Sequence, residues 1–418
     1  MPSDEWSGPA PTPTAPRTST RAVLAIGIAT GVISLAFMWL TAPEQVRLAS
    51  DVYMRAAEAL LAGEDIYAVS PSRLNDYYYL YPPIVTLLFV PHALVGSSLV
   101  AFGIQTALNV GASVGTAAII YRALQRRGIA LERFDFGLLV GFVLTSAYAA
   151  IPLINGQVTH WLALAFAVGF DALDRRRESL AGAAFAVAAL IKVFPAAIGL
   201  WLLRRRAWRA VGVAVLTGMG GLLLGVLLFG PDLTVTYFSD VLVGRYTGSS
   251  FDGTPAVSRN VDGLRRQLAA LVDVSRPVRT ALSVGILAPI LAILYKETDT
   301  DARRQAAGLG TVVATLLFLP LQPMYSLLFV FPLCVLLYRL PSGRPRTVLV
   351  VGTLCSYLVV GFEEVVIAVE AVPIPEAVAA PLLGAVEAVF TVILPPTVGL
   401  WLLLAACVLV ARDSELQM

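Results

Sequence analysis

The stretch PPIVTLLFVPHALVG, residues 82–96, decides how this chain is threaded through a membrane. It is apolar along most of its length, yet it has only fifteen residues and contains Pro82, Pro83 and Pro91. A helix that crosses the hydrocarbon core needs about 20 apolar residues, and an internal proline removes a helical hydrogen bond. We therefore expect this segment to lie horizontally or half-buried at the membrane surface.

The rest of the sequence predicts an integral membrane protein. Of its 418 residues, 57% are hydrophobic and 14% are charged, whereas an ordinary soluble domain is about 25% charged. Uncharged apolar runs of roughly 18 residues or more recur along the chain, and they favour an all-α polytopic bundle of about 12 transmembrane helices. The predicted helices are residues 21–41, 98–121, 135–152, 156–173, 179–192, 194–203, 209–230, 277–295, 303–320, 322–338, 346–370 and 386–411. The three cysteines fall inside such runs, without metal-like spacing, and are interpreted as small apolar residues.

Basic residues set the predicted orientation. If residues 82–96 do not cross, most of the 30 basic residues fall on one side of the membrane, including the clusters at 122–133, 175–177 and 204–209. If they do cross, every cluster after the first changes side. The positive-inside rule therefore favours the first arrangement, with both termini cytoplasmic and the protein in the cell membrane.

This topology defines the expected organisation. Residues 1–20 are rich in Pro, Thr and Ser and are predicted to be a disordered cytoplasmic tail. Residues 21–418 form the membrane domain, whose long outer segments are 42–97 and 231–276. Chemistry in a membrane enzyme needs polar groups at a water-accessible face, so the candidate site residues are sought there. No internal repeat is evident, which weakens a transporter built from repeated halves.

Asp51 is the candidate catalytic residue. It shares a polar helical stripe with Arg55 and Glu58, and an apolar stripe that includes Val52 lies on the other side. This pattern indicates a short amphipathic helix on the outer surface. Two interpretations remain open: Asp51 stabilises the helix start, where Ser50 is a possible cap, or pairs with Arg55; or it is a general base.

Further polar residues are candidates for sugar or acceptor binding. Tyr81 ends a tyrosine cluster in NDYYYLYPP, and the stretch INGQVTHW places Asn155, Gln157 and His160 at an outer helix junction. Tyrosines at an interface are also ordinary belt residues, and Asn-Gly also favours a simple turn. The alternative for these side chains is therefore a purely structural role.

Basic residues on the same side are candidates for phosphate binding. Lys192, in LIKVFP, ends an apolar run, where an ammonium is either functional or extends to the interface. Arg259, Arg265 and Arg266 lie in the outer segment together with Asn260, a further candidate sugar ligand. Basic residues on this side favour an anionic partner, either a substrate phosphate or lipid head groups.

Several chemistries have no motif in this sequence. It lacks a phosphate-binding loop, a nucleotide-binding GxGxxG, a zinc-like His or Cys cluster and a Ser nucleophile elbow. It also lacks a soluble domain that would hold a nucleotide sugar. We therefore expect an activated donor from within the membrane. A lipid-phosphate leaving group does not by itself demand a divalent metal, so neither a cofactor nor an essential metal is expected. Nucleic acid is not an expected partner, since the net charge is only +2.

These features together resemble a known family. Asp51 after the first helix, ALLAGEDIY, YLYPPIVTLLFVPHAL, NGQVTHWLAL, LIKVFPA and the Asn-containing SRNVDG follow one another over residues 50–265. Their order resembles glycosyltransferase family 87, the polyprenyl-phosphate-sugar-dependent mannosyltransferases of GT-C fold. SRNVDG departs from the Asn-Gln-Ser type of motif that is expected there.

The resemblance implies a GT-C-type helical bundle with juxtamembrane helices in the first outer loop. It implies inverting transfer of a sugar, mannose in the family, from a polyprenyl- or dolichyl-phosphate donor, with Asp51 at the catalytic acidic position. The implied acceptor is a glycolipid, lipid-linked glycan or cell-envelope glycan at the outer face. The alternative function is a transporter or flippase of lipid-linked sugars, which would need alternating access.

Overall fold

The computed structural model describes residues 14–71, 77–245, 257, 263–319 and 322–413. Within these ranges every regular element is a helix, and no strand occurs. The first elements are α1 (Thr14–Thr41), η1 (Pro43–Gln45), α2 (Leu48–Ala62), η2 (Pro83–Phe89), α3 (Val90–Leu94), α4 (Ser98–Arg126), α5 (Arg133–Thr145), α6 (Ala150–Asn155) and α7 (Thr159–Asp174). The middle elements are α8 (Glu178–Ile191), η3 (Phe194–Ile198), α9 (Gly199–Arg204), α10 (Trp208–Phe229), α11 (Pro231–Thr236), η4 (Tyr237–Arg245), α13 (Leu264–Leu271) and α14 (Arg276–Lys296). The last are α15 (Asp301–Phe318), η5 (Pro323–Phe329), α16 (Val330–Arg339), α17 (Arg344–Ser356), α18 (Phe362–Glu370), α19 (Glu376–Val392) and α20 (Pro395–Arg412).

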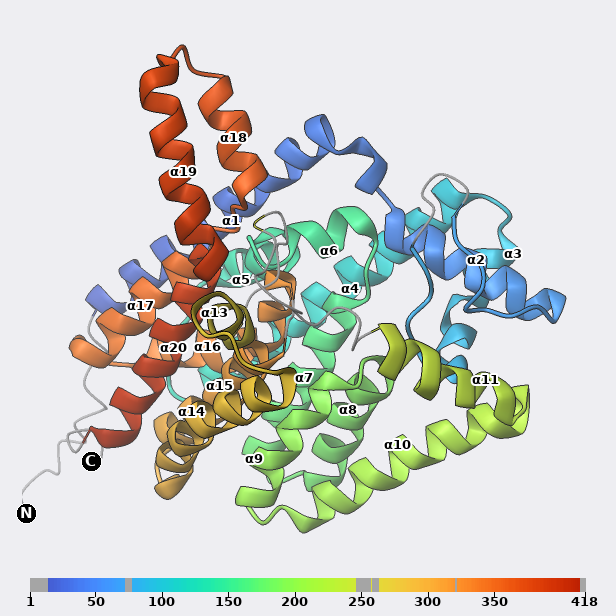
Figure 1. The fold of residues 1–418 in the computed structure, drawn as a ribbon. Coiled ribbons are helices and arrows are strands. Elements are labelled where there is room, and N and C mark those ends of the chain that lie inside the picture. The colour runs from blue at the N-terminus through green and yellow to red at the C-terminus, as the bar shows by residue number, and fades with distance from the viewer. Residues whose placement is uncertain (1–13, 72–76, 246–256, 258–262, 320–321, 414–418) are drawn as a thin grey trace, which may run out of the picture.

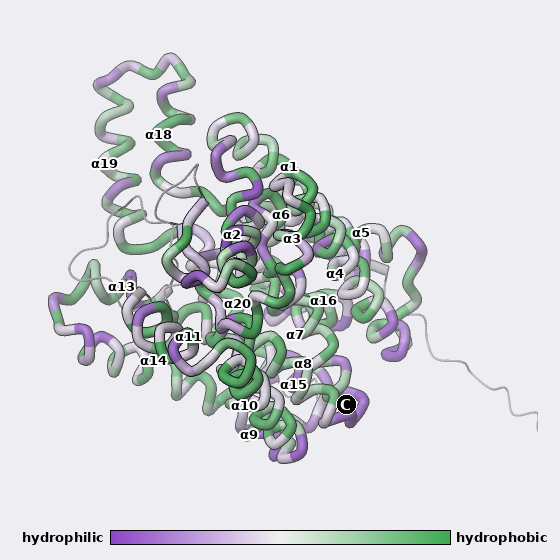
Figure 2. The backbone as a smooth tube through the Cα atoms, turned by 90° about the vertical axis from the view of Figure 1, so that its right-hand side faces the viewer, coloured by the Kyte–Doolittle hydropathy of each residue, from purple (hydrophilic) through white to green (hydrophobic). Residues whose placement is uncertain are grey.

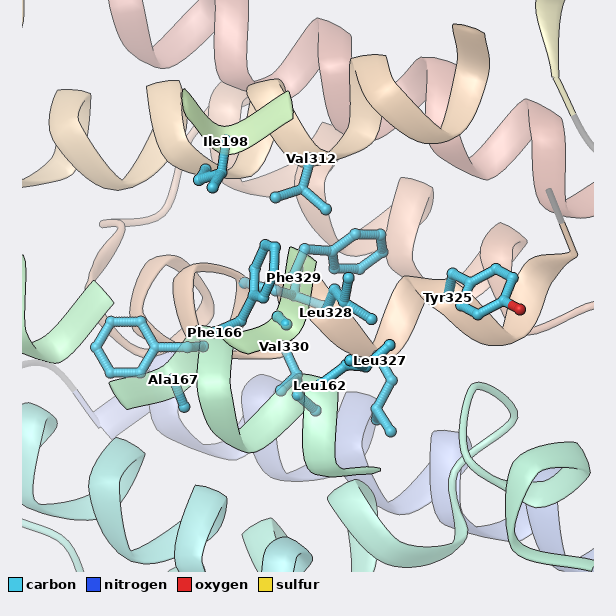
Figure 3. Close-up of a cluster of buried hydrophobic side chains, with 14 of the residues drawn as sticks. Leu162, Phe166, Ala167, Ile198, Val312, Tyr325, Leu327, Leu328, Phe329 and Val330 are labelled. Carbon is cyan, nitrogen blue, oxygen red and sulfur yellow. The ribbon is translucent and has the colours of Figure 1, made fainter. Parts of the chain in front are cut away.

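The core lies where α7, α15, η5 and α16 meet (Figure 1). All residues of α16 from Val330 to Tyr338 are buried, as expected for a helix that is apolar on every side. Figure 3 shows Phe166 of α7 among side chains of η5, with Tyr325 at the edge of the cluster and its hydroxyl pointing away from it. The apolar core therefore fixes η5 in place and leaves one polar group at its border.

Five helices in the described part of the chain are long and apolar enough to cross a membrane: α1, α4, α10, α14 and α20. Residues 82–96 form the short elements η2 and α3 and no long helix. The prediction of an all-helical membrane protein is thus confirmed, whereas the count of 12 spans stays a prediction. In Figure 2 hydrophobic residues run along the bundle helices and hydrophilic stretches gather near helix ends.

Three of the predicted helices are interrupted, which corrects the sequence-based boundaries. The predicted helix 135–152 ends at Thr145 and resumes at Ala150, and the predicted helix 346–370 ends at Ser356. These two breaks face each other, because the buried Tyr148 hydroxyl is hydrogen-bonded to the Ser356 hydroxyl. The predicted helix 386–411 breaks at Pro395, as expected for a residue that lacks a backbone N–H.

A short local repeat accompanies the two long 3₁₀ elements. PIVTLLFV at 83–90 and PMYSLLFV at 323–330 are identical at five of their eight positions. Both begin with proline, form seven residues of 3₁₀-helix and continue into an α-helix at Val90 or Val330. The repeat covers two short segments and not two halves of the chain, so it does not indicate a transporter built from repeated halves.

Helix α8 packs closely on α10 through Gly182. A Cβ atom on this residue would lie 2.1 Å from the carbonyl oxygen of Ala210, so only glycine fits without a shift of the helices. Small residues at such contacts let two helix backbones approach within a membrane. This contact holds α8, which carries Lys192 at its C-terminal end, against α10.

Ion pairs join the helix ends on the predicted cytoplasmic side. Arg127, after α4, pairs with Asp174 at the end of α7 and, over 2.8 Å from its Nε, with Asp301 at the start of α15. Asp301 also pairs with Arg339 of α16. Four helices are therefore tied together by one cluster of charges that lies away from the polar cavities described below.

Candidate functional site

Asp51 lies on the first turns of α2. The helix begins at Leu48, after Arg47 with a left-handed φ of 61°, so Ser50 is inside the helix and is not its cap. Asp51 is 8% exposed, and its side chain accepts a hydrogen bond from the Ser98 hydroxyl and lies 3.4 Å from Nε of Arg47. Arg55 pairs instead with Glu58, over 2.9 Å. The interpretation of Asp51 as the partner of Arg55 is therefore wrong, and its carboxylate is held by α4 and by the start of α2.

A polar cavity of about 360 Å³ opens beside Asp51. Its lining residues come from α2, from the start of α4 and from loop residues beside these helices: Arg47, Asp51, Met54, Arg55, Glu58, Pro71, Gly96 and Ser98. A carboxylate next to guanidinium groups in a water-accessible cavity can accept a proton from a bound hydroxyl. Ser98 is not among the site residues predicted from the sequence. The only sequence signal for it is its position at the start of a predicted helix.

Lys192 lines a different cavity, of about 340 Å³, on another face of α2. It follows α8 and is 7% exposed. Its Nζ donates a hydrogen bond to the Tyr325 hydroxyl over 2.7 Å and lies 5.0 Å and 4.9 Å from the ring centroids of Tyr81 and Tyr325. An ammonium between two aromatic faces is stabilised by their quadrupoles. The cation is thus fixed at a cavity wall.

Tyr81 connects this cavity to α2. Its hydroxyl is 2.8 Å from that of Tyr53, and its backbone oxygen accepts a hydrogen bond of 2.8 Å from the Tyr67 hydroxyl. Burial raises the pKa of Tyr53, so its phenol stays neutral at physiological pH. Tyr53, Tyr67 and Tyr81 are therefore packed together and joined by hydrogen bonds, unlike the separate tyrosines of an interfacial belt.

Two amides complete the polar side of the Lys192 cavity. Asn155 ends α6 and Gln157 precedes α7, and both line the cavity. Within the described part of the chain their buried side-chain oxygens have no hydrogen-bond partner. Because an unsatisfied buried acceptor is costly, such groups are expected to meet a ligand or water. A polyhydroxylated ligand would satisfy both.

Two apolar grooves meet behind Lys192. One, of about 420 Å³, lies between α8, the η3–α9 segment and α10, and Pro82 and Val193 line it. The other, of about 430 Å³, lies between η3–α9, α14 and α15, and Val193 lines it as well. Pro82 and Val193 directly follow Tyr81 and Lys192, which line the polar cavity. A polar cavity therefore adjoins apolar grooves of the kind that hold a lipid chain.

The structure brings together some of the predicted site residues and separates others. Lys192, Tyr81, Asn155 and Gln157 share one cavity. Asp51 lines the other polar cavity, so it does not face Lys192 across a single space.

The remaining candidates lie elsewhere. His160 is fully buried in α7 and lines neither polar cavity. Arg266 of α13 is 1% exposed and donates to the backbone oxygen of Phe390 over 2.7 Å, which is a structural contact. Arg265 donates a hydrogen bond to Thr280 and does not line the Lys192 cavity. Arg259 and Asn260 fall outside the described residues.

Tyr325 is the main residue that sequence reasoning missed. It comes from η5 and lines the Lys192 cavity together with Gln322. The available signal is a tyrosine and a glutamine around Pro323 in an otherwise apolar stretch. No group of three or more His, Cys, Asp or Glu side chains that could hold a metal ion occurs among the described residues.

Comparison with known proteins identifies the class of enzyme. The model of glycosyltransferase family 87 matches residues 79–320, more than half of the chain. This region contains Tyr81, Asn155, Gln157 and Lys192, whereas Asp51 precedes it. Searches of the curated proteins and of the solved structures gave no match. The chain, with its polar cavity set against apolar grooves in a helical membrane bundle, belongs to glycosyltransferase family 87.

Proposed function

We propose that this glycosyltransferase moves a sugar, mannose in the first instance, from a polyprenyl- or dolichyl-phosphate donor to a lipid-linked or cell-envelope glycan at the outer membrane face. The observation that carries the proposal is the position of Lys192. Its ammonium borders a polar cavity, and the next residue, Val193, lines apolar grooves. A lipid-phosphate sugar has the same order of parts: a polar sugar, an anionic phosphate and a long apolar chain.

The donor is proposed to place its phosphate at Lys192 and its chain in the groove between α8 and α10. Tyr81 and the amides Asn155 and Gln157 would then bind sugar hydroxyls. Negative charge on the phosphate grows as the glycosidic bond breaks, so a fixed ammonium stabilises the transition state more than the ground state. Because a lipid phosphate leaves as an anion already bound by Lys192, the proposal includes no essential metal and no cofactor.

Asp51 is proposed to be the general base that deprotonates the acceptor hydroxyl. Attack on the sugar from the side opposite the leaving phosphate inverts the anomeric configuration. A base must come within hydrogen-bond reach of its proton, but Asp51 and Lys192 line separate cavities. The mechanism therefore requires substrates, or a shift of α2, to join the two cavities during the reaction.

The experiment is sugar transfer by the full chain in reconstituted membranes. Radiolabelled polyprenyl-phosphate mannose is compared with nucleotide-activated mannose, with native lipid extract as the acceptor. Transfer from the lipid donor alone is expected. Transfer from the nucleotide sugar alone would contradict the proposal. Movement of the labelled lipid between leaflets without any transfer would favour the flippase function.

A further inference from the structure

The groove between η3–α9, α14 and α15 carries a cluster of arginines at one end. Along α14 the groove-lining residues Val284, Leu287, Ala288 and Leu291 form one stripe at helical spacing. Continued toward the start of the helix, in steps of four residues, the same stripe reaches Thr280 and Arg276. One face of α14 is therefore apolar along the groove and polar at its outer end.

Arg265 of α13 reaches the same place from the neighbouring helix. Its guanidinium donates to the Thr280 hydroxyl over 3.2 Å, and that hydroxyl donates in turn to the backbone oxygen of Arg276 over 3.0 Å. The Arg265 guanidinium also lies 4.7 Å from the ring centroid of Phe318, which lines the groove. It is thus positioned over the groove mouth.

The surroundings of Arg265 favour an anion. Its observed contacts are a hydroxyl and an aromatic ring, and its buried Nε has no hydrogen-bond partner among the described residues. Burial lowers the pKa of Arg265, and the neighbouring charges of Arg276 and Arg279 lower it further. An anion would satisfy the free N–H and reduce this repulsion.

We infer that this groove binds an anionic phospholipid, with its phosphate at Arg265 and Arg276 and an acyl chain along Val284, Leu287 and Ala288. The groove shares no lining residue with the Lys192 cavity. It shares only Val193 with the groove proposed for the donor, since η3 and α9 lie between the two grooves. The enzyme would thus hold a second lipid while its donor is bound. This binding does not require sugar transfer.

The test uses the full chain in nanodiscs of phosphatidylcholine. A phosphatidylglycerol probe with a photoreactive acyl chain is crosslinked, and labelled peptides are mapped by mass spectrometry. We expect labelling of α14 and α15, and competition by unlabelled phosphatidylglycerol but not by equimolar inorganic phosphate. The double substitution Arg265→Gln with Arg276→Gln should reduce labelling by at least about tenfold, because the loss of even one charge-assisted hydrogen bond has an effect of this size. Arg133→Gln, an exposed arginine at the start of α5, is the matched control and should label like the wild type.

A second pair of variants tests the groove without changing charge. Ala288→Trp fills the groove and should reduce labelling, whereas Ile286→Trp, on an exposed face of the same helix, should not. Equal labelling of the double arginine variant and the wild type would overturn the inference. So would equal labelling by a phosphatidylcholine probe, displacement by equimolar inorganic phosphate, or stronger competition by polyprenyl phosphate than by phosphatidylglycerol, which would assign the groove to the donor.

Discussion

The Nζ of Lys192 donates a hydrogen bond of 2.7 Å to the hydroxyl of Tyr325, 133 residues further along the chain. This bond joins the end of α8 to η5, whose apolar residues are part of the core (Figure 3). The cation of the proposed donor site is therefore held in place by the most buried part of the protein. A positioned charge of this kind needs little reorganisation during a reaction.

Replacing Lys192 should weaken donor use. Lys192→Gln removes the charge while keeping a polar side chain, and we expect kcat/KM for the lipid donor to fall about 10- to 100-fold, as for the loss of a charged hydrogen bond. Tyr325→Phe keeps the ring next to Nζ and removes only the hydroxyl, so its loss should be smaller. Initial rates at varied donor concentration measure both. A Lys192→Gln enzyme with wild-type kinetics would exclude the phosphate contact.

Replacing Asp51 should remove the base without removing the fold. Asp51→Asn keeps an oxygen that can accept from Ser98, so the thermal midpoint should change little, while transfer should fall by about 10²–10⁴-fold. The matched control is Glu64→Gln, an exposed acid just after α2. If Asp51→Asn transfers sugar like the control, Asp51 is a structural residue at the start of α2.

The contact of α8 with α10 should depend on glycine at one position only. Gly182→Ala places a methyl group against the Ala210 carbonyl, and overpacking of this kind costs about 1–3 kcal/mol of unfolding free energy. Gly212 of α10 has no neighbour within 4 Å of an added Cβ, so Gly212→Ala should be neutral or stabilising. Thermal unfolding in detergent compares the two. Equal unfolding midpoints for the two variants would show that the close contact of α8 with α10 does not contribute to stability.

The two acids that share Arg127 should differ in their effect on stability. Burial raises the pKa of Asp301, but the hydrogen bond and charge of Arg127 and the charges of Arg339 and Arg304 outweigh it, so the net pKa is lowered. For Asp174 burial outweighs the charge of Arg127, and the net pKa is raised. Ionisation of Asp301 therefore stabilises the folded state at neutral pH, whereas ionisation of Asp174 disfavours it relative to the neutral carboxyl.

We expect Asp301→Asn to cost about 1–3 kcal/mol at pH 7, below the full loss for a buried pair because Asp301 is partly exposed, and Asp174→Asn to cost less. A lowered pKa gives stability that is present above the unfolded value, near 3.9, and is lost as the pH falls below it. The difference between wild type and Asp301→Asn should therefore shrink from pH 6 to about pH 3. Chemical unfolding across this pH range measures the stability difference. A difference that grows toward acid pH would contradict the lowered pKa of Asp301.

The path of residues 82–96 predicts which side of the membrane two exposed positions occupy. Glu64 and Arg133 are separated by this segment and by α4. If η2 and α3 do not cross, Glu64→Cys and Arg133→Cys lie on opposite sides, and a membrane-impermeant maleimide added outside intact cells labels only position 64. Labelling of both from one side would mean that η2 and α3 cross. The native cysteines Cys334 and Cys407 are buried and should not react with the maleimide.

The sequence by itself determined that this is a helical membrane protein and that residues 82–96 form no long helix, because length, charge and proline content act locally. It also signalled Lys192, Tyr81, Asn155 and Gln157, since polar residues beside apolar runs are few. Only the tertiary structure decided that these four share a cavity, that Tyr325 joins them, and that Asp51 lies on another face of α2. The breaks at Thr145 and Ser356 also escaped the sequence, because the contact of Tyr148 with Ser356 accompanies them. Periodicity reports which residues are apolar, but the meeting of groups far apart in the chain depends on how the helices pack.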